Sequence, residues 1–89
     1  MPKDKRYTVI KNLLAGGYIK SFDEIFDTLP KSVLYKDLGM NSERFRKLLK
    51  HPELFILKDL FRIAALIGTE EKTIVDLVFG SYASRKKTK

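Results

Sequence analysis

The stretch that most constrains the fold of this chain is residues 31–50, KSVLYKDLGMNSERFRKLLK. On either side of a central glycine, its apolar residues are spaced three and four apart, which places them on one face of an α-helix. Gly39 tolerates a positive φ and can therefore end the first helix sharply. Asn41 or Ser42 then offers a side-chain oxygen that can cap the second helix. We therefore predict two short helices joined by a tight turn, which is a helix-turn-helix arrangement.

The same helical spacing recurs before and after this stretch. It predicts a short N-terminal helix over Tyr7–Ala15, a helix over 21–29, a helix over Leu57–Ile67 and a last helix that Gly80 closes. Alternation with a period of two is not sustained anywhere, so no strand is predicted. The predicted fold class is all-α, a small bundle of five main helices plus the short N-terminal one.

Length and composition indicate one small domain. The chain has 89 residues, 44% of them hydrophobic, which is enough for a single core of packed helices. We expect 1–20 to form an accessory helix and a basic arm, 21–80 to form the helix-turn-helix domain, and 81–89 to be a basic tail. The chain has no cysteine, so disulfides and thiolate metal sites are excluded. No secretory signal and no apolar run near the ~20 residues of a membrane span is found, and we expect a cytoplasmic protein without membrane association.

The charge balance favours a polyanionic partner. Lys and Arg number 18 against 11 Asp and Glu, for a formal net charge of +7. Such an excess is typical of proteins that bind nucleic acid or an anionic membrane surface, although a soluble protein can simply be basic. Basic residues also gather at both ends of the chain, where they suit either an arm along DNA or a solubilising tail.

Counted from Lys31, twenty residues resemble the helix-turn-helix motif of the phage-repressor-like (xenobiotic-response-element type) family. Gly39 stands at the ninth position, where that motif has its turn glycine. The motif's apolar positions hold Leu34, Leu38, Met40, Phe45 and Leu48. The later segment LKDLFRIAALIGTEEKTIVDLV is similar to the helices that follow in the family. The resemblance covers about 21–79, and it implies a lambda-repressor-like fold and sequence-specific binding of double-stranded DNA by a small transcriptional regulator.

Two positions depart from the family pattern. Tyr35 stands at the fifth position, where the family has alanine or another small residue packed against the second helix. Ser32 stands where the family often has a glutamine that grips a phosphate or a base. These departures motivate an alternative function on the same fold, an antitoxin-like or adaptor module that binds another protein.

The resemblance implies a recognition helix over about 42–50 that enters the major groove. The candidates for base contacts are Asn41, Ser42, Glu43, Arg46, Lys47 and Lys50. The candidates for phosphate contacts are Lys31, Ser32, Lys36 and Arg44. A carboxylate can accept from cytosine, an amide can pair with adenine, and a cation can reach guanine. The alternatives are a solvated cationic face and, for Ser32 and Asn41, plain helix caps.

No constellation of residues indicates an enzyme. His51 is the only histidine and has no ligand partner at helical spacing, so no metal site is predicted. No glycine-rich phosphate loop is present, and we expect no cofactor and no catalytic residue. Helix-turn-helix proteins that read DNA sequence generally bind DNA as dimers. The apolar residues of the last helix offer the most favourable homodimer surface; they are Ile74, Val75, Val78 and Phe79.

Overall fold

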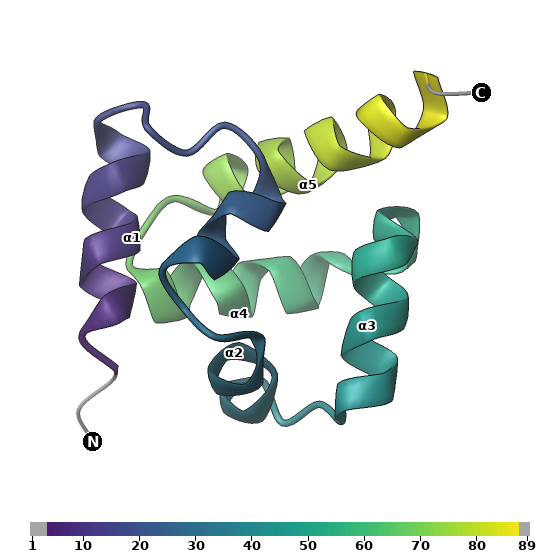
Figure 1. The fold of residues 1–89 in the computed structure, drawn as a ribbon, viewed down its shortest axis with the longest axis horizontal. Helices are drawn as coiled ribbons and strands as arrows, with labels where there is room; N and C mark the ends of the chain where they lie inside the picture. Colours follow the sequence, from purple (N-terminus) through teal and green to yellow (C-terminus); the bar gives the residue numbers. More distant parts are fainter. Residues whose placement is uncertain (1–3, 88–89) are drawn as a thin grey trace.

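The computed structural model describes the backbone of residues 4–87 and the side chains of residues 4–83, and every regular element in this part is helical. The α-helices are α1 (Arg6–Ala15), α2 (Lys31–Asp37), α3 (Ser42–Lys50), α4 (Leu57–Ile67) and α5 (Glu71–Lys87). Two 3-10 helices, η1 (Phe22–Asp27) and η2 (Pro52–Leu54), lie between α1 and α2 and between α3 and α4. The all-α prediction is confirmed (Figure 1).

The helices are arranged around α4. In Figure 1, α1 and α3 stand at opposite ends of α4, and α5 runs back across the molecule from the end of α4. α4 packs against both α1 and α5, while η1 and η2 pack on α5. α2 is seen end-on where α3 lies in the plane of the view, so the two helices cross steeply (Figure 1). This crossing leaves one long side of α3 at the edge of the bundle.

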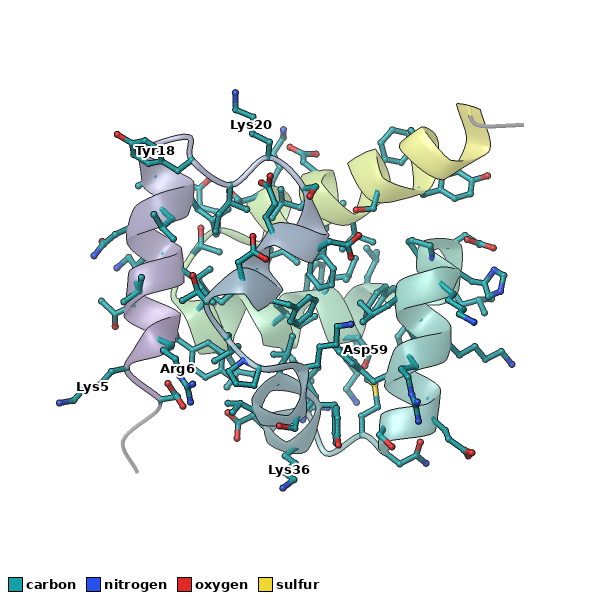
Figure 2. The ribbon with its side chains drawn as sticks, in the orientation of Figure 1. Lys5, Arg6, Tyr18, Lys20, Lys36 and Asp59 are labelled. Carbon is teal, nitrogen blue, oxygen red and sulfur yellow. The ribbon has the colours of Figure 1, made fainter. Side chains whose placement is uncertain are left out.

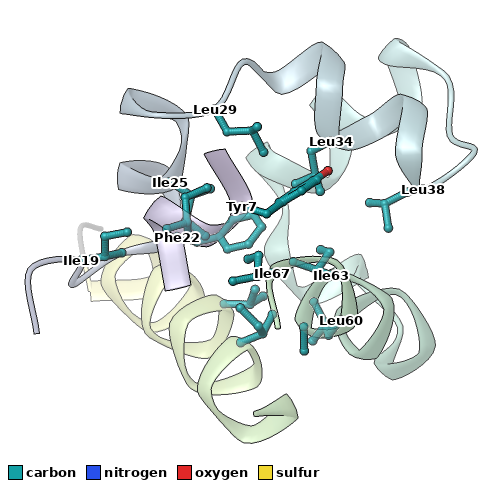
Figure 3. Packing of buried hydrophobic residues seen from close by; sticks show 14 of the residues in the cluster. Tyr7, Ile19, Phe22, Ile25, Leu29, Leu34, Leu38, Leu60, Ile63 and Ile67 are labelled. Carbon is teal, nitrogen blue, oxygen red and sulfur yellow. The ribbon is translucent and has the colours of Figure 1, made fainter. Parts of the chain in front are cut away.

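A single hydrophobic core joins the five α-helices and η1. Tyr7 and Ile10 of α1 are buried in the same cluster as residues of η1, α2, α3, α4 and α5. Figure 3 shows the ring of Tyr7 amid Ile25, Ile63 and Ile67, which come from η1 and α4. The helix predicted within 1–20 is therefore packed into the core that residues 21–80 form.

The segment predicted as a helix over 21–29 is a 3-10 helix over Phe22–Asp27. With three residues per turn, residues three apart lie above one another, and Phe22 and Ile25 are both buried on that side. Its first turn is capped, because the Glu24 carboxylate accepts from the backbone N–H of Ser21 at 3.2 Å.

The sequence predicted that Gly80 ends the last helix, and this prediction is wrong. α5 continues through it to Lys87, and Ser81 Oγ donates to the carbonyl oxygen of Leu77 at 3.3 Å. An exposed glycine inside a helix costs only about 1 kcal/mol relative to alanine. The buried side chains of Ile74 and Val78 hold α5 on the core up to this point. The predicted tail over 81–89 therefore begins inside a helix, and residues 88–89 lie outside the described part.

Candidate nucleic-acid interface

The turn between α2 and α3 forms as the sequence predicted. Gly39 has a φ of +73°, in the left-handed region that favours glycine. Its backbone N–H donates to the carbonyl oxygen of Lys36 at 3.0 Å, and the N–H of Met40 donates to that of Tyr35 at 2.9 Å. This pair of bonds satisfies the last carbonyl groups of α2 in the way of a Schellman motif. The glycine therefore ends α2 within one residue and redirects the chain into α3.

Asn41 is the residue that caps α3. Its backbone is extended, and its side-chain oxygen accepts from the backbone N–H of Arg44 at 2.8 Å. Ser42 is the first helical residue and is half-buried. A bidentate contact to adenine needs both the oxygen and the nitrogen of the Asn41 amide. The structure thus supports the capping role for Asn41, and base reading by this amide would require the cap to open.

The cations of α3 all lie on its solvent side. Phe45 and Leu48 are buried, whereas Arg44, Arg46, Lys47 and Lys50 are exposed together with Glu43. At 100° per residue, Lys47 and Lys50 lie near the middle of the exposed side, with Arg46 on one flank and Arg44 on the other. Glu43 lies between the two flanks. The helix therefore presents a cationic surface while two apolar side chains fix it to the core.

The side chain of Tyr35 packs against α3. Its ring is half-buried and lies 5.8 Å from the ring of Phe45. On its other side Phe45 meets the ring of Phe26 edge-on at 5.9 Å. The fifth position of the motif thus holds an aromatic residue that joins the two helices directly. The departure at Tyr35 is accommodated by packing.

One open depression of about 530 Å³ gathers predicted site residues from two helices. Lys31 of α2 lines it together with Arg46 and Lys50 of α3. The Lys31 ammonium also lies over the ring of Phe26, 5.9 Å from its centroid. The remaining lining residues are Asp23, Phe26, Asp27 and Leu49. A phosphate candidate and two base candidates therefore share one surface, which two acidic side chains of η1 also border.

The other phosphate candidates are placed differently. Ser32 and Lys36 are exposed on α2, and Lys36 projects from this helix into solvent at the edge of the molecule (Figure 2). Arg44 is held by an acid on another helix, because its Nη2 lies 3.4 Å from Oδ2 of Asp59. The structure thus leaves Ser32 and Lys36 accessible and ties Arg44 to α4.

Asp59, the buried partner of Arg44, was not identified from the sequence. Its carboxylate lies in the first turn of α4 and is the one charged side chain buried within the described residues. Figure 2 shows it between α4 and α3. In the sequence, Asp59 is the one acid inside the periodic apolar run LKDLFRIAALI. An acid in such a run is ordinarily assigned to the solvent-facing side of the helix.

A second polar contact between distant residues joins α1 to α2. The Tyr7 hydroxyl of α1 donates to Oδ2 of Asp37, the last residue of α2, at 2.7 Å. Burial raises the pKa of the Tyr7 phenol, and the Asp37 carboxylate raises it further, because both favour the neutral form. α1 is therefore tied to the helix that directly precedes the Gly39 turn.

The N-terminal arginine expected in a basic arm is already paired. Arg6 is the first residue of α1, and its Nη2 lies 2.7 Å from Oδ2 of Asp4. Hydrogen bonds from Arg6 hold the pKa of the Asp4 carboxyl down at about 2. Lys5 is exposed (Figure 2), and Lys3 lies outside the described residues.

The predicted homodimer surface on α5 is only partly available. Ile74 and Val78 are buried in the core, and Val75 is half-buried. Phe79 is 64% exposed, with its ring 6.3 Å from that of Tyr82. Other large apolar side chains are exposed on η2, on α4 and between them; they are Leu54, Ile56, Leu57 and Phe61.

These features define a small all-α protein with a cationic helix at the edge of its bundle. Across residues 4–87 no group of three acidic or histidine side chains is placed to hold a metal ion. None of the helices in that range combines the length and apolarity that a membrane span requires. The chain matches no family model, no curated protein and no solved structure.

Proposed function

We propose that this protein binds double-stranded DNA sequence-specifically through α3 and acts as a small transcriptional regulator. The observation that carries the proposal is the exposure of every α3 cation on a helix that the Gly39 turn sets across α2. A helix of this kind can lie in a major groove while the preceding helix crosses the backbone. A lambda-repressor-like arrangement of the bundle and a cytoplasmic location belong to the same proposal.

The residues divide into two groups by their position on the surface. Glu43, Lys47 and Lys50 follow one another at helical spacing along the middle of the exposed side of α3, where base edges would lie. The base candidates Ser42 and Arg46 flank them. Lys31, Ser32, Lys36 and Arg44 are the phosphate candidates, and they fix register without reading sequence. Asn41 caps the helix that carries the base readers.

The first test is selection of bound duplexes from a random pool, followed by titration of the selected duplex at several salt concentrations. The three cationic phosphate candidates, Lys31, Lys36 and Arg44, predict a slope of about −2.7 for log K against log salt. Arg46→Ala and Lys47→Ala should each weaken binding by about tenfold, since a good base contact contributes about 1–3 kcal/mol. Lys20→Ala removes the same charge from the loop after α1 and serves as the matched control (Figure 2).

Two results would contradict the proposal. One is failure of the wild-type protein to bind any duplex at ~50 mM salt, where phosphate contacts are strongest. The other is an equal loss of affinity in all three variants, which would show that the α3 cations contribute only through the net charge of the protein.

A homodimer on paired half-sites is part of the proposal, with Val75 and Phe79 as its remaining α5 contacts. Ile74 and Val78 cannot contribute to the dimer surface because they are buried in the core of the monomer. Half-sites one helical turn apart, about 34–36 Å, would be expected in the selected duplexes.

An antitoxin-like or adaptor protein is the second candidate function. The observation that favours it is the exposure of Ile56, Leu57 and Phe61, because apolar groups exposed together mark protein-binding surfaces. A partner whose binding is lost on Leu57→Ser and kept on Arg46→Ala would support this candidate. A partner that binds through Arg46 would instead point back to the cationic helix.

A further inference from the structure

The pairing of Asp59 with Arg44 joins a buried acid to an exposed cation. The exposed fractions of the two side chains are 8% for Asp59 and 53% for Arg44. A buried carboxylate is costly without a partner, and Arg44 supplies its one ion pair among the described residues. Asp59 also lies in the first turn of α4, where the partial positive charge of the helix end favours a carboxylate. The carboxylate is thus fixed, and it constrains the arginine.

The arginine keeps free donors on its outer side. The guanidinium is a planar fork of five N–H donors, and its hydrogen bond to Asp59 is donated by Nη2. More than half of the side chain faces solvent at the first turn of α3. Arg46, two residues along the same helix, has no ion pair in the described part of the chain. Arg44 is therefore the α3 arginine whose head group is held by an ion pair within the described residues.

We infer that Asp59 is a positioning residue that orients Arg44 toward a DNA phosphate. The inference rests on the proposed DNA-binding function. One edge of the guanidinium bonds Asp59 while another meets the phosphate, so less side-chain freedom is lost when the complex forms. Because the buried carboxylate requires Arg44 to stay within reach, Arg44 contacts the backbone and does not enter the groove to read a base.

This role predicts a change of sign that net charge alone does not. Removal of an acid from a DNA-binding surface ordinarily strengthens binding, because the local potential becomes more positive. If Asp59 orients Arg44, Asp59→Asn instead weakens binding. In an Arg44→Ala background the arginine is gone, and the same Asp59→Asn change strengthens binding. A reversal of sign between the two backgrounds is expected only if Asp59 acts by positioning Arg44.

The experiment titrates a labelled random-sequence duplex by fluorescence anisotropy between ~50 and 200 mM salt, because phosphate contacts are independent of sequence. Asp59→Asn should weaken binding by about two- to fivefold, the range expected for a partly exposed ion pair. The salt slope should fall by up to about 0.9, the contribution of one phosphate contact. Glu53→Gln removes an exposed acid next to the end of α3 and should leave affinity unchanged or slightly raised.

The outcomes separate the inference from the function beneath it. A wild-type protein that does not bind the duplex overturns the proposed function. A wild-type protein that binds, with Asp59→Asn equal to or tighter than it, overturns the inference alone. Weaker binding with an unchanged salt slope also overturns it, since this indicates a merely structural effect of the buried acid.

A measurement on the wild-type protein covers the case in which Asp59→Asn fails to fold. Side-chain ¹⁵N relaxation reports the order of each arginine Nε–H on the picosecond-to-nanosecond timescale. Arg44 should be clearly more ordered than Arg46 in the free protein. Equal order for the two arginines would overturn the inference without any variant.

Discussion

Two glycines offer one chemical change with opposite expected effects. Gly39 has a φ of +73°, and a Cβ built on it meets no atom within 4 Å. Gly80 lies inside α5, and a Cβ there also meets no atom within 4 Å. Because neither methyl group gains or loses a contact, replacement by alanine measures backbone conformation alone. We expect Gly39→Ala to destabilise the protein and Gly80→Ala to stabilise it.

The magnitudes follow from the two conformations. An alanine in the left-handed conformation costs about 1–2 kcal/mol. Alanine also lowers the conformational entropy of the unfolded chain, which offsets about 0.4–1 kcal/mol of this cost. Gly39→Ala should therefore lower the free energy of unfolding by about 1 kcal/mol. Alanine is better than glycine in a helix by about 0.8–1.0 kcal/mol, so Gly80→Ala should raise it by a similar amount. In a domain of this size 1 kcal/mol moves Tm by about 4–8 °C.

The assay is thermal and urea unfolding followed by circular dichroism, with m compared among the variants to check that the unfolded state is unchanged. Gly39→Asn is the matched control, because asparagine tolerates the left-handed region and should recover part of the loss. A Gly39→Ala protein as stable as wild type would refute the left-handed turn between α2 and α3. A Gly80→Ala protein less stable than wild type would refute a helix that continues through this position.

Three further predictions concern the contacts that hold α2 and α3. Tyr7→Phe removes the hydroxyl that bonds Asp37 and keeps the buried ring, so it should lower the free energy of unfolding by about 1.5 kcal/mol. In a double-mutant cycle, Asp37→Asn should add little destabilisation in the Tyr7→Phe background. Because the pKa of Tyr7 is raised in the folded protein, its contribution to stability is complete below the unfolded pKa of about 10 and is lost as pH rises above it. Alkaline titration should therefore destabilise wild type more steeply than Tyr7→Phe, and parallel curves would contradict this. Asn41→Ala should cost about 1 kcal/mol through the lost cap; a DNA-affinity loss without a stability loss would show base reading instead.

Helix positions were predictable wherever a nearby residue decides them. Gly39 and Gly68 end α2 and α4 with positive φ, and His51–Pro52 follows directly on α3. The N-cap of α3 fell on one of the two residues named for it. These features depend on φ preferences and on side chains within a few positions of the helix end. Such preferences act in the same way in any surrounding.

The misassigned elements were those in which packing outweighs local preference. η1 has three residues per turn, and its Phe22 and Ile25 are buried together in the core. α5 passes through Gly80 because the core contacts of Ile74 and Val78 hold the helix that contains it. Periodicity places both residues of α5 on one apolar side of the helix. It cannot decide whether that side meets the core or a second protein.

The candidate site divides in the same way. Exposure of Arg46, Lys47 and Lys50 follows from the apolar face of α3, so sequence spacing identified this surface. The partner of Arg44 did not follow from spacing, because Asp59 lies 15 residues away on another helix. Its burial reverses the usual expectation for an acid, and Arg44 acquires a constraint that its exposed position alone does not indicate.

The sequence by itself determined where α2, α3 and α4 end and which side of α3 carries charge, because backbone preferences and helical periodicity are local properties. Only the tertiary structure decided which charges are paired. The Tyr7–Asp37 bond spans 30 residues, and the Arg44–Asp59 pair joins two helices. Contacts of this kind depend on how the core brings distant segments together, and that arrangement is set by the packing of the whole chain.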